Sequence, residues 1–184
     1  MRCFIAIEVP GEIKEKIISL QKEIEKSNAD LKFVENENLH LTLKFLGEID
    51  EEKIKEINAI IEEITKDTHK FKIQLSMLGV FPNFNYLRVI WVGVTEGKNE
   101  ILELHSKLDS KLREIGIKKD EQFETHLTIA RVRSARNKDL LIKKIKEFYH
   151  TQIGEFEVDE IKLKKSTLTS TGPIYTDLRT FKLV

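Results

Sequence analysis

Two short segments carry the same residue types in the same order: His40-Leu41-Thr42 and His126-Leu127-Thr128. Both lie in stretches where polar and apolar residues alternate, a pattern that predicts β-strands. Because successive side chains of a strand point to opposite faces, each histidine shares a face with the threonine two positions later. Each segment therefore offers a polar face for a site and an apolar face for a core.

This pairing suits acid–base chemistry at phosphorus. An imidazole has a pKa of about 6.5, so histidine gains and loses a proton near neutrality. Two histidines on opposite sides of a cyclic phosphodiester can deprotonate an attacking water and protonate the departing ribose oxygen. Threonine hydroxyls on the same faces can donate to the nonbridging oxygens, where negative charge builds. Each histidine alone would be an ordinary strand residue, but the matched pair favours His40 and His126 as catalytic and Thr42 and Thr128 as phosphate ligands.

Four further residues near the motifs or the last turn are candidate substrate contacts: Lys44, Phe45, Arg131 and Tyr175. Strand alternation puts Lys44 on the predicted polar face, as a neighbour of the phosphate. It puts Phe45 on the apolar face, which favours core packing over stacking on a base. Arg131 also falls off the polar face unless a β-bulge re-aims it. Arg133 and Arg136 form a local basic cluster beside these candidates.

The sequence predicts neither a metal site nor a cofactor. Cys3 is the only cysteine, which excludes an internal disulfide and a cysteine cluster, and no His-Glu-x-x-His spacing occurs. The other three histidines, His69, His105 and His150, fall on predicted helices or at their ends, and we interpret them as solvated surface residues.

The elements that must position these residues mix hairpins with helix crossovers, which indicates an α+β fold. Strands are predicted over residues 3–9, 31–34, 39–46, 71–81, 86–95, 125–133, 155–168 and 174–184. Helices are predicted over residues 11–27, from a cap at Asp50 onward, over 98–115 and over 138–149. Each half of the chain offers a helix, a His-Leu-Thr strand and another helix. This repetition predicts one bilobal domain over residues 1–184, with two antiparallel sheets, pseudo-twofold symmetry, outer helices and a central cleft.

The composition limits the classes of partner that the chain is expected to bind. The chain has 184 residues, 40% of them hydrophobic and 34% charged, with 31 basic and 31 acidic side chains. Zero net charge gives no global field for long nucleic acids, so any RNA contact must come from a local patch, which suggests a short or terminal substrate. No apolar run is long enough for a membrane span. We expect a cytoplasmic protein, acting as a monomer.

The chain resembles the 2H phosphoesterase superfamily, named for two His-x-Thr-x motifs on paired strands. Within it the chain is similar to the LigT-like RNA 2′,3′-cyclic phosphodiesterases of archaeal type, also called 2′-5′ RNA ligases. The likeness covers nearly the whole chain, and both motifs match without departure. It includes the stretches FIAIEVP, FVENENLHLTLKFLGEI, Leu78–Pro82 running into Arg88–Trp91, and KKSTLTSTGPIY.

The resemblance implies that His40 is the proton donor to the leaving 3′ oxygen and that His126 is the proton acceptor that activates water. The product would be an RNA 2′-phosphate. The resemblance also implies ATP-independent joining of 2′,3′-cyclic phosphate and 5′-hydroxyl ends, with tRNA halves among the candidate substrates. Two alternatives stay open: a phosphodiesterase acting on a small cyclic nucleotide, and a non-catalytic module that binds RNA ends.

Overall fold

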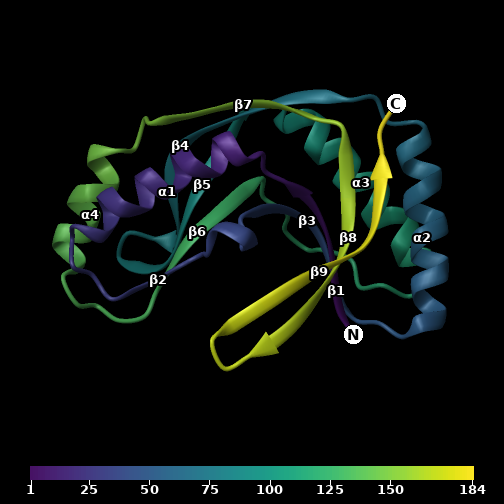
Figure 1. The fold of residues 1–184 in the computed structure, drawn as a ribbon, viewed down its shortest axis with the longest axis horizontal. Coiled ribbons are helices and arrows are strands. Elements are labelled where there is room, and N and C mark those ends of the chain that lie inside the picture. Colours follow the sequence, from purple (N-terminus) through teal and green to yellow (C-terminus); the bar gives the residue numbers. More distant parts are fainter.

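The computed structural model describes residues 1–184 and contains helices packed against two antiparallel sheets (Figure 1). The strands are β1 (Arg2–Glu8), β2 (Leu31–Phe33), β3 (His40–Glu48), β4 (Phe71–Asn83), β5 (Tyr86–Glu96), β6 (His126–Val132), β7 (Gln152–Val158), β8 (Glu160–Thr169) and β9 (Gly172–Lys182). The helices are α1 (Gly11–Glu25), α2 (Glu51–Lys66), α3 (Lys98–Glu114) and α4 (Lys138–Glu147), with a 3-10 turn at Asn36–Asn38. Sheet A has the order β3-β1-β8-β9, and sheet B has the order β2-β6-β5-β4-β7. The expected α+β fold with two antiparallel sheets is confirmed.

Each sheet is covered by its own pair of helices. α2 and α3 pack against each other and against sheet A, whereas α1 and α4 do the same on sheet B (Figure 1). All four helices bury an apolar stripe, such as Ile13, Ile17 and Ile24 on α1. The cap at Asp50 is present, because its side chain accepts a hydrogen bond from the Lys53 backbone N–H at 2.8 Å.

The single strand expected over residues 155–168 is wrong, because the chain breaks there into two strands in different sheets. β7 pairs with β4 in sheet B, and β8 pairs with β1 and β9 in sheet A. Asp159 lies between them. Alternation of buried and exposed side chains continues up to both sides of the break, so the sequence pattern gives no sign that the chain changes sheets.

The two halves of the chain repeat one arrangement. The order β1, α1, β3, α2 is matched by β5, α3, β6, α4, and the pairs β1·β3 and β5·β6 are both antiparallel. One continuous hydrophobic cluster includes buried residues of both sheets. The two motif strands also come together, since Cα atoms of β3 and β6 approach to within 8 Å of one another. No helix has the length and apolarity that crossing a membrane requires.

Candidate active site

A β-bulge follows the first motif. On β1, Ala6 pairs with Thr42 and Ile5 pairs with Lys44, so Leu43 is an extra residue without a partner position. A bulge shifts the alternation of side chains by one position. Beyond it, Lys44 turns into the core, with 1% of its surface exposed, and Phe45 turns out on the other face, with 69% exposed.

The second motif strand has the same bulge at the same place. Trp91 on β5 pairs with Thr128 and Ile90 pairs with Ala130, which leaves Ile129 as the extra residue. Ala130 is fully buried and Arg131 is exposed. The bulge that could re-aim Arg131 is therefore present, and it turns the guanidinium to the face of the motif histidine.

Two expectations fail for this reason. Strict alternation assigned Lys44 to the polar face and Phe45 to the core, and the bulge reverses both. Lys44 is wrong as a neighbour of the phosphate, because its ammonium group is buried on the opposite side of the sheet. Phe45 is wrong as a core residue, because its ring lies 6.1 Å from the Phe4 ring, which itself stacks on His40.

Both histidines present the same nitrogen to the site. Nδ1 of His40 lies 2.7 Å from the Asn38 carbonyl oxygen, and Nδ1 of His126 lies 3.0 Å from the Glu124 carbonyl oxygen. A carbonyl oxygen only accepts hydrogen bonds, so Nδ1 carries the proton in each ring. Nε2 is then left for proton transfer in each ring. The two rings therefore make the same nitrogen available for proton exchange.

The two motif threonines differ in their hydrogen bonds. Thr42 Oγ1 lies 3.0 Å from His40 Nε2 and donates its proton to this nitrogen when the ring is neutral. Thr128 is half-buried on the same face as His126 and makes no such bond. The histidine and threonine of the first motif are therefore bonded to each other, and those of the second motif are not.

Aromatic rings hold each imidazole. Phe4 stacks on His40 with 4.9 Å between ring centroids, and Tyr175 meets the same ring edge-on at 5.2 Å. Phe81 meets His126 edge-on at 4.9 Å, and Trp91 lies 6.1 Å away. These contacts limit the rotation of both imidazoles and remove water from one side of each ring.

The Trp91 ring fits only because residue 79 is glycine. A Cβ atom at Gly79 would come within 2.1 Å of the indole carbon Cζ2. Phe81 packs on the same indole, with 5.0 Å between centroids. The glycine thus lets Trp91 and Phe81 lie together beside His126.

Burial keeps both histidines neutral near neutrality. It lowers the pKa of His40 to about 4, against the effect of the hydrogen bond to Asn38, and the charge of Lys164 lowers the pKa further. Burial also lowers the pKa of His126, where the Glu124 carbonyl opposes the shift and Arg131 adds to it. Near neutrality both Nε2 atoms are therefore proton acceptors.

A charged cluster lies beside His40 on the same face of sheet A. Glu8 pairs with His40 across β1 and β3, and its carboxylate contacts the ammonium group of the buried Lys164. Asp177 contacts Lys164 at 3.0 Å and Lys162 at 2.8 Å. These partners lower the pKa of Asp177 although burial opposes them, so the cluster is ionised near neutrality.

Behind the first motif, the buried Lys44 ammonium group ties three segments together. Its Nζ lies 2.7 Å from Asp109 on α3 and 3.0 Å from Asp120 in the segment before β6, and it donates to the Lys118 carbonyl at 2.6 Å. Asp120 also bonds His105 Nε2 at 2.8 Å.

His105 is buried, so its expected place on the surface is wrong, whereas His69 and His150 are exposed. The donor atoms of His105, Asp109 and Asp120 lie within 4.8 Å of one another, as metal ligands could. The Lys44 ammonium group, however, already supplies the positive charge between the two carboxylates. The cluster is therefore an ion network rather than a metal centre.

The model of the family "LigT like Phosphoesterase" matches this chain twice, over residues 7–91 and over residues 92–175. The two matches contain one His-Leu-Thr motif each and together span most of the sequence. The chain belongs to the LigT-like phosphoesterase family. The double match also agrees with the repeated order of elements in the two halves.

Named proteins and a solved structure are similar to this LigT-like phosphoesterase over nearly its whole length. A Methanocaldococcus jannaschii protein named RNA 2′,3′-cyclic phosphodiesterase is 46% identical over 95% of this chain and 96% of its own length. A protein of the same name from Methanothermobacter thermautotrophicus is 36% identical over 100% and 99%. The crystal structure of Escherichia coli LigT in apo form has a TM-score of 0.79 and 27% identity, covering 99% of this chain and 96% of its own.

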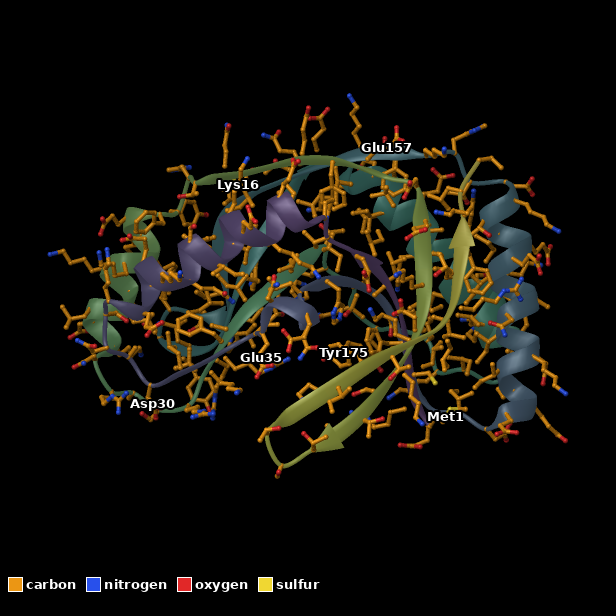
Figure 2. The ribbon with its side chains drawn as sticks, viewed as in Figure 1. Met1, Lys16, Asp30, Glu35, Glu157 and Tyr175 are labelled. Carbon is orange, nitrogen blue, oxygen red and sulfur yellow. The ribbon has the colours of Figure 1, made fainter.

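The charge of Arg131 acts on residues of both sheets in this LigT-like phosphoesterase. Arg131 is close enough to His126 to lower the pKa of that ring, and its charge also acts on Tyr175, where burial raises the pKa and Arg131 opposes the rise. Figure 2 shows Tyr175 where the β8–β9 hairpin crosses the middle of the molecule. The structure thus brings Arg131, Phe45 and Tyr175 to the motif faces, and of the four candidate contacts only Lys44 is turned away.

Sequence reasoning missed the residues that surround the imidazoles: Phe4, Glu8, Phe81, Trp91 and Lys164. All five lie within stretches that carry the family resemblance, which could have drawn attention to them. Their roles depend on cross-strand register, such as Glu8 opposite His40, and register is set by partners far away in the sequence.

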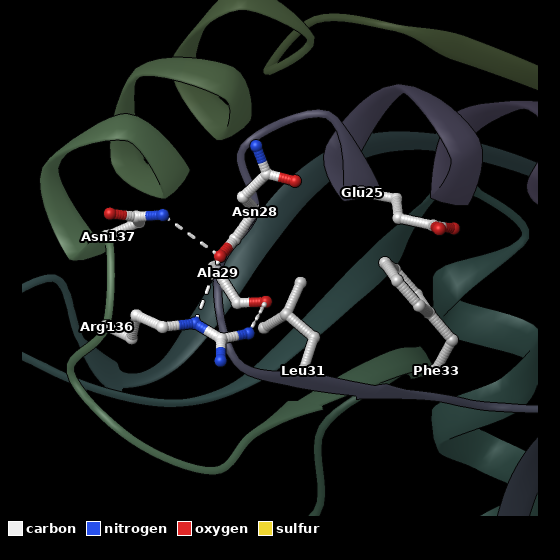
Figure 3. Close-up of a pocket in the computed structure, with 7 residues that line it drawn as sticks. All are labelled: Glu25, Asn28, Ala29, Leu31, Phe33, Arg136 and Asn137. Carbon is white, nitrogen blue, oxygen red and sulfur yellow. Dashed lines mark hydrogen bonds between the residues drawn. The ribbon is translucent and has the colours of Figure 1, made fainter.

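A hollow of about 500 Å³ lies away from both histidines, where α1 ends and α4 begins (Figure 3). Arg136 donates there to the backbone carbonyls of Asn28 at 3.2 Å and Ala29 at 3.5 Å, and Asn137 also donates to the Asn28 carbonyl. These bonds join the loop before α4 to the end of α1, so the Arg136 side chain has a structural role.

Proposed function

We propose that this LigT-like phosphoesterase hydrolyses the 2′,3′-cyclic phosphate ends of RNA to 2′-phosphates, with His40 and His126 as its acid–base pair. The main observation behind the proposal is that both imidazoles are held in the same orientation by the same kind of hydrogen bond. Each ring has Nδ1 bonded to the carbonyl two residues before it, with Nε2 left for chemistry. Two archaeal relatives are named RNA 2′,3′-cyclic phosphodiesterase, which supports this substrate.

The reaction needs one bond formed and one broken at phosphorus. His126 Nε2 takes a proton from water as the water oxygen bonds to phosphorus. The bond between phosphorus and the ribose 3′ oxygen breaks, and His40 Nε2 gives its proton to that oxygen. The products are a 2′-phosphate and a 3′-hydroxyl. Thr42 and Thr128, on the histidine faces, donate to the nonbridging oxygens, where charge accumulates.

The role of His40 as proton donor rests on the family resemblance, since both rings present Nε2 in the same way. A pKa of about 4 leaves this ring unprotonated in the ligand-free protein at neutral pH. A phosphodiester anion near Nε2 favours the imidazolium form, because an opposite charge raises the pKa of a histidine. Binding of the substrate therefore loads the acid with its proton.

The substrate class extends to other ends that share this chemistry. Escherichia coli LigT has been solved in complex with 3′-AMP, which supports a site able to take a nucleotide at its phosphate. We place tRNA halves with a cyclic phosphate among the RNA ends to be tested, and we expect the protein to work as a cytoplasmic monomer without a cofactor.

A short RNA with a 2′,3′-cyclic phosphate tests the proposal directly. The purified protein and its His126→Ala variant are incubated with this RNA in excess chelator, and the product end is identified by mass and by its resistance to a phosphatase that removes only 3′-phosphates. We expect a 2′-phosphate from the wild-type protein alone. An unchanged cyclic end would contradict the proposal, and a longer product formed with a 5′-hydroxyl RNA would reassign the site to strand joining.

A further inference from the structure

A second hollow, of about 230 Å³, lies where β5 begins and β6 ends. Three cationic side chains line it, those of Arg88, Arg133 and Lys138, together with the aromatic ring of Tyr86. We call these four residues the basic rim. No aspartate or glutamate lines this hollow, and none of the three cations lies within 4.0 Å of a carboxylate. In a chain of zero net charge, this is a local concentration of unneutralised positive charge.

The aromatic member of the rim is held open to solvent. Tyr86 is 55% exposed, and the Arg88 guanidinium lies 4.5 Å from the centre of its ring and donates to its hydroxyl oxygen. A cation fixed over one part of an exposed ring gives a flat, positively charged platform. Bases stack on such aromatic rings with little regard to sequence, and basic side chains follow the phosphates.

Cations connect the rim to the catalytic face. β6 runs from His126 to Val132, a length of roughly 20 Å at the usual rise of a strand. Arg131 is exposed on the face of His126, and Arg133 follows two positions later, already in the rim. The Arg133 backbone N–H is bonded to the Asp30 carbonyl at 2.8 Å, so the segment that carries this cation is held in place.

From this arrangement we propose that the basic rim binds the single-stranded RNA upstream of the cyclic phosphate. The inference rests on the proposed function, and it makes a strand of RNA, rather than a single nucleotide, the preferred substrate. A cyclic phosphate ends its strand, so the remaining chain leaves the site in one direction only. Arg131 and Arg133 lead in that direction along β6, and Tyr86 and Arg88 receive the chain where the strand ends.

The neighbouring Arg136 does not belong to this track. Its guanidinium donates to two backbone carbonyls at the end of α1, as Figure 3 shows. Its substitution would disturb the fold of that loop, whereas Arg88 and Arg133 are exposed and carry no comparable bond to another segment. The charges of Arg88 and Arg133 can therefore be removed with little effect on the structure. Lys138 donates to the Asn85 carbonyl across the same hollow, and glutamine at this position keeps an N–H donor.

The test compares two substrates and two matched variants. One variant, Arg88→Gln/Arg133→Gln/Lys138→Gln, removes the charge of the rim. The control, Arg113→Gln/Lys55→Gln/Lys111→Gln, removes the same charge from exposed positions on α2 and α3. Hydrolysis of a short RNA with a cyclic phosphate is measured beside hydrolysis of 2′,3′-cyclic AMP, which is too small to reach the rim.

We expect kcat/KM for the RNA to fall about tenfold or more in the rim variant and not in the control. The kcat/KM for 2′,3′-cyclic AMP should stay unchanged in both variants. Binding of the RNA should also depend less on salt. The plot of log binding constant against log salt concentration should become less steep by about two units for the three lost cations. Tyr86→Ala should weaken RNA binding about tenfold, and Tyr86→Phe should restore it. Equal losses on both substrates, or no loss on the RNA, would overturn the proposal.

A binding measurement separates this inference from the proposed function. Fluorescence anisotropy of a labelled short RNA that ends in a 2′-phosphate needs no turnover. If the wild-type protein cleaves neither substrate, the proposed function fails, and weaker RNA binding by the rim variant than by the control still supports the rim. Equal binding by both variants overturns the rim whatever the activity.

Discussion

Phe45 and Arg131 hold equivalent positions in the two lobes, each five residues after a motif histidine and each turned to the histidine face by a β-bulge. Without the bulges both side chains would point into the hydrophobic core. One lobe thus presents an exposed aromatic ring and the other an exposed guanidinium. A ring can stack on a base, and a guanidinium can pair with a phosphate or stack as well.

Replacement of Phe45 by alanine should weaken binding of the RNA end without loss of stability. The ring is mostly exposed, so we expect the free energy of unfolding to change by about 0.5 kcal/mol or less, while RNA binding falls about tenfold. Phe4→Ala is the matched control, because that ring is buried in the same cluster and its loss should cost about 3–5 kcal/mol. Urea unfolding and anisotropy measure the two effects, and a Phe45→Ala protein with unchanged RNA binding would remove the ring from the site.

The two histidines should act as a unit. His40→Ala and His126→Ala are each expected to remove most of the activity, on the order of 10²–10⁴-fold, since each takes one partner from a coupled proton transfer. The double variant should lose little more than either single one. Single-turnover rates on an RNA with a cyclic phosphate give the comparison, and losses that simply multiply would contradict the paired mechanism.

The threonines should contribute less than the histidines. Thr42→Ala and Thr128→Ala each remove one donor to the phosphate, which we expect to cost about 10²-fold in kcat. Serine keeps the hydroxyl, so Thr42→Ser and Thr128→Ser should recover most of this loss. If serine is as poor as alanine in steady-state rates, the hydroxyl is not the functional group.

Acidification should protonate His40 only well below neutrality. Burial lowers the pKa of this ring to about 4, so its NMR titration in the free protein should have a midpoint near that value. Inorganic phosphate or the 2′-phosphate product should raise the midpoint, because the anion favours the imidazolium. A midpoint of about 6.5 that phosphate does not move would contradict the burial argument.

The same shift has a consequence for stability. Between the unfolded pKa of about 6.5 and the folded value, the unfolded chain binds more protons than the folded one, so stability is lost as the pH falls through this range. His40 alone accounts for about 3 kcal/mol of this loss. Urea unfolding of His40→Gln at about pH 7 and about pH 4.5 should show a smaller difference than the wild-type protein.

Removal of the buried Lys44 ammonium group should be costly. Lys44→Ala leaves the buried carboxylate of Asp109 and the half-buried carboxylate of Asp120 without their cation, so we expect a loss of about 3 kcal/mol in the free energy of unfolding. Lys165→Ala on β8 is the control, because this lysine has no ion-pair partner. Adding Asp109→Asn to Lys44→Ala should return part of the stability, and a double variant that is no better than the single one would contradict the account.

The sequence by itself determined the two motifs, the order of most elements and the α+β class. These features are local, because the alternation of His, Leu and Thr needs only a strand, and the apolar stripes of the helices need only a period of 3.6 residues. The repeated motif also led to the family without any knowledge of contacts.

Only the tertiary structure decided which face Lys44 and Phe45 occupy, where residues 152–169 change sheets, and which side chains surround each imidazole. A bulge depends on the register between strands that are far apart in the chain, as β1 is from β3 and β5 is from β6. One inserted residue reverses every later side chain, so local alternation cannot predict it. The burial that lowers the pKa of His40 likewise comes from partners that fold against it from other strands.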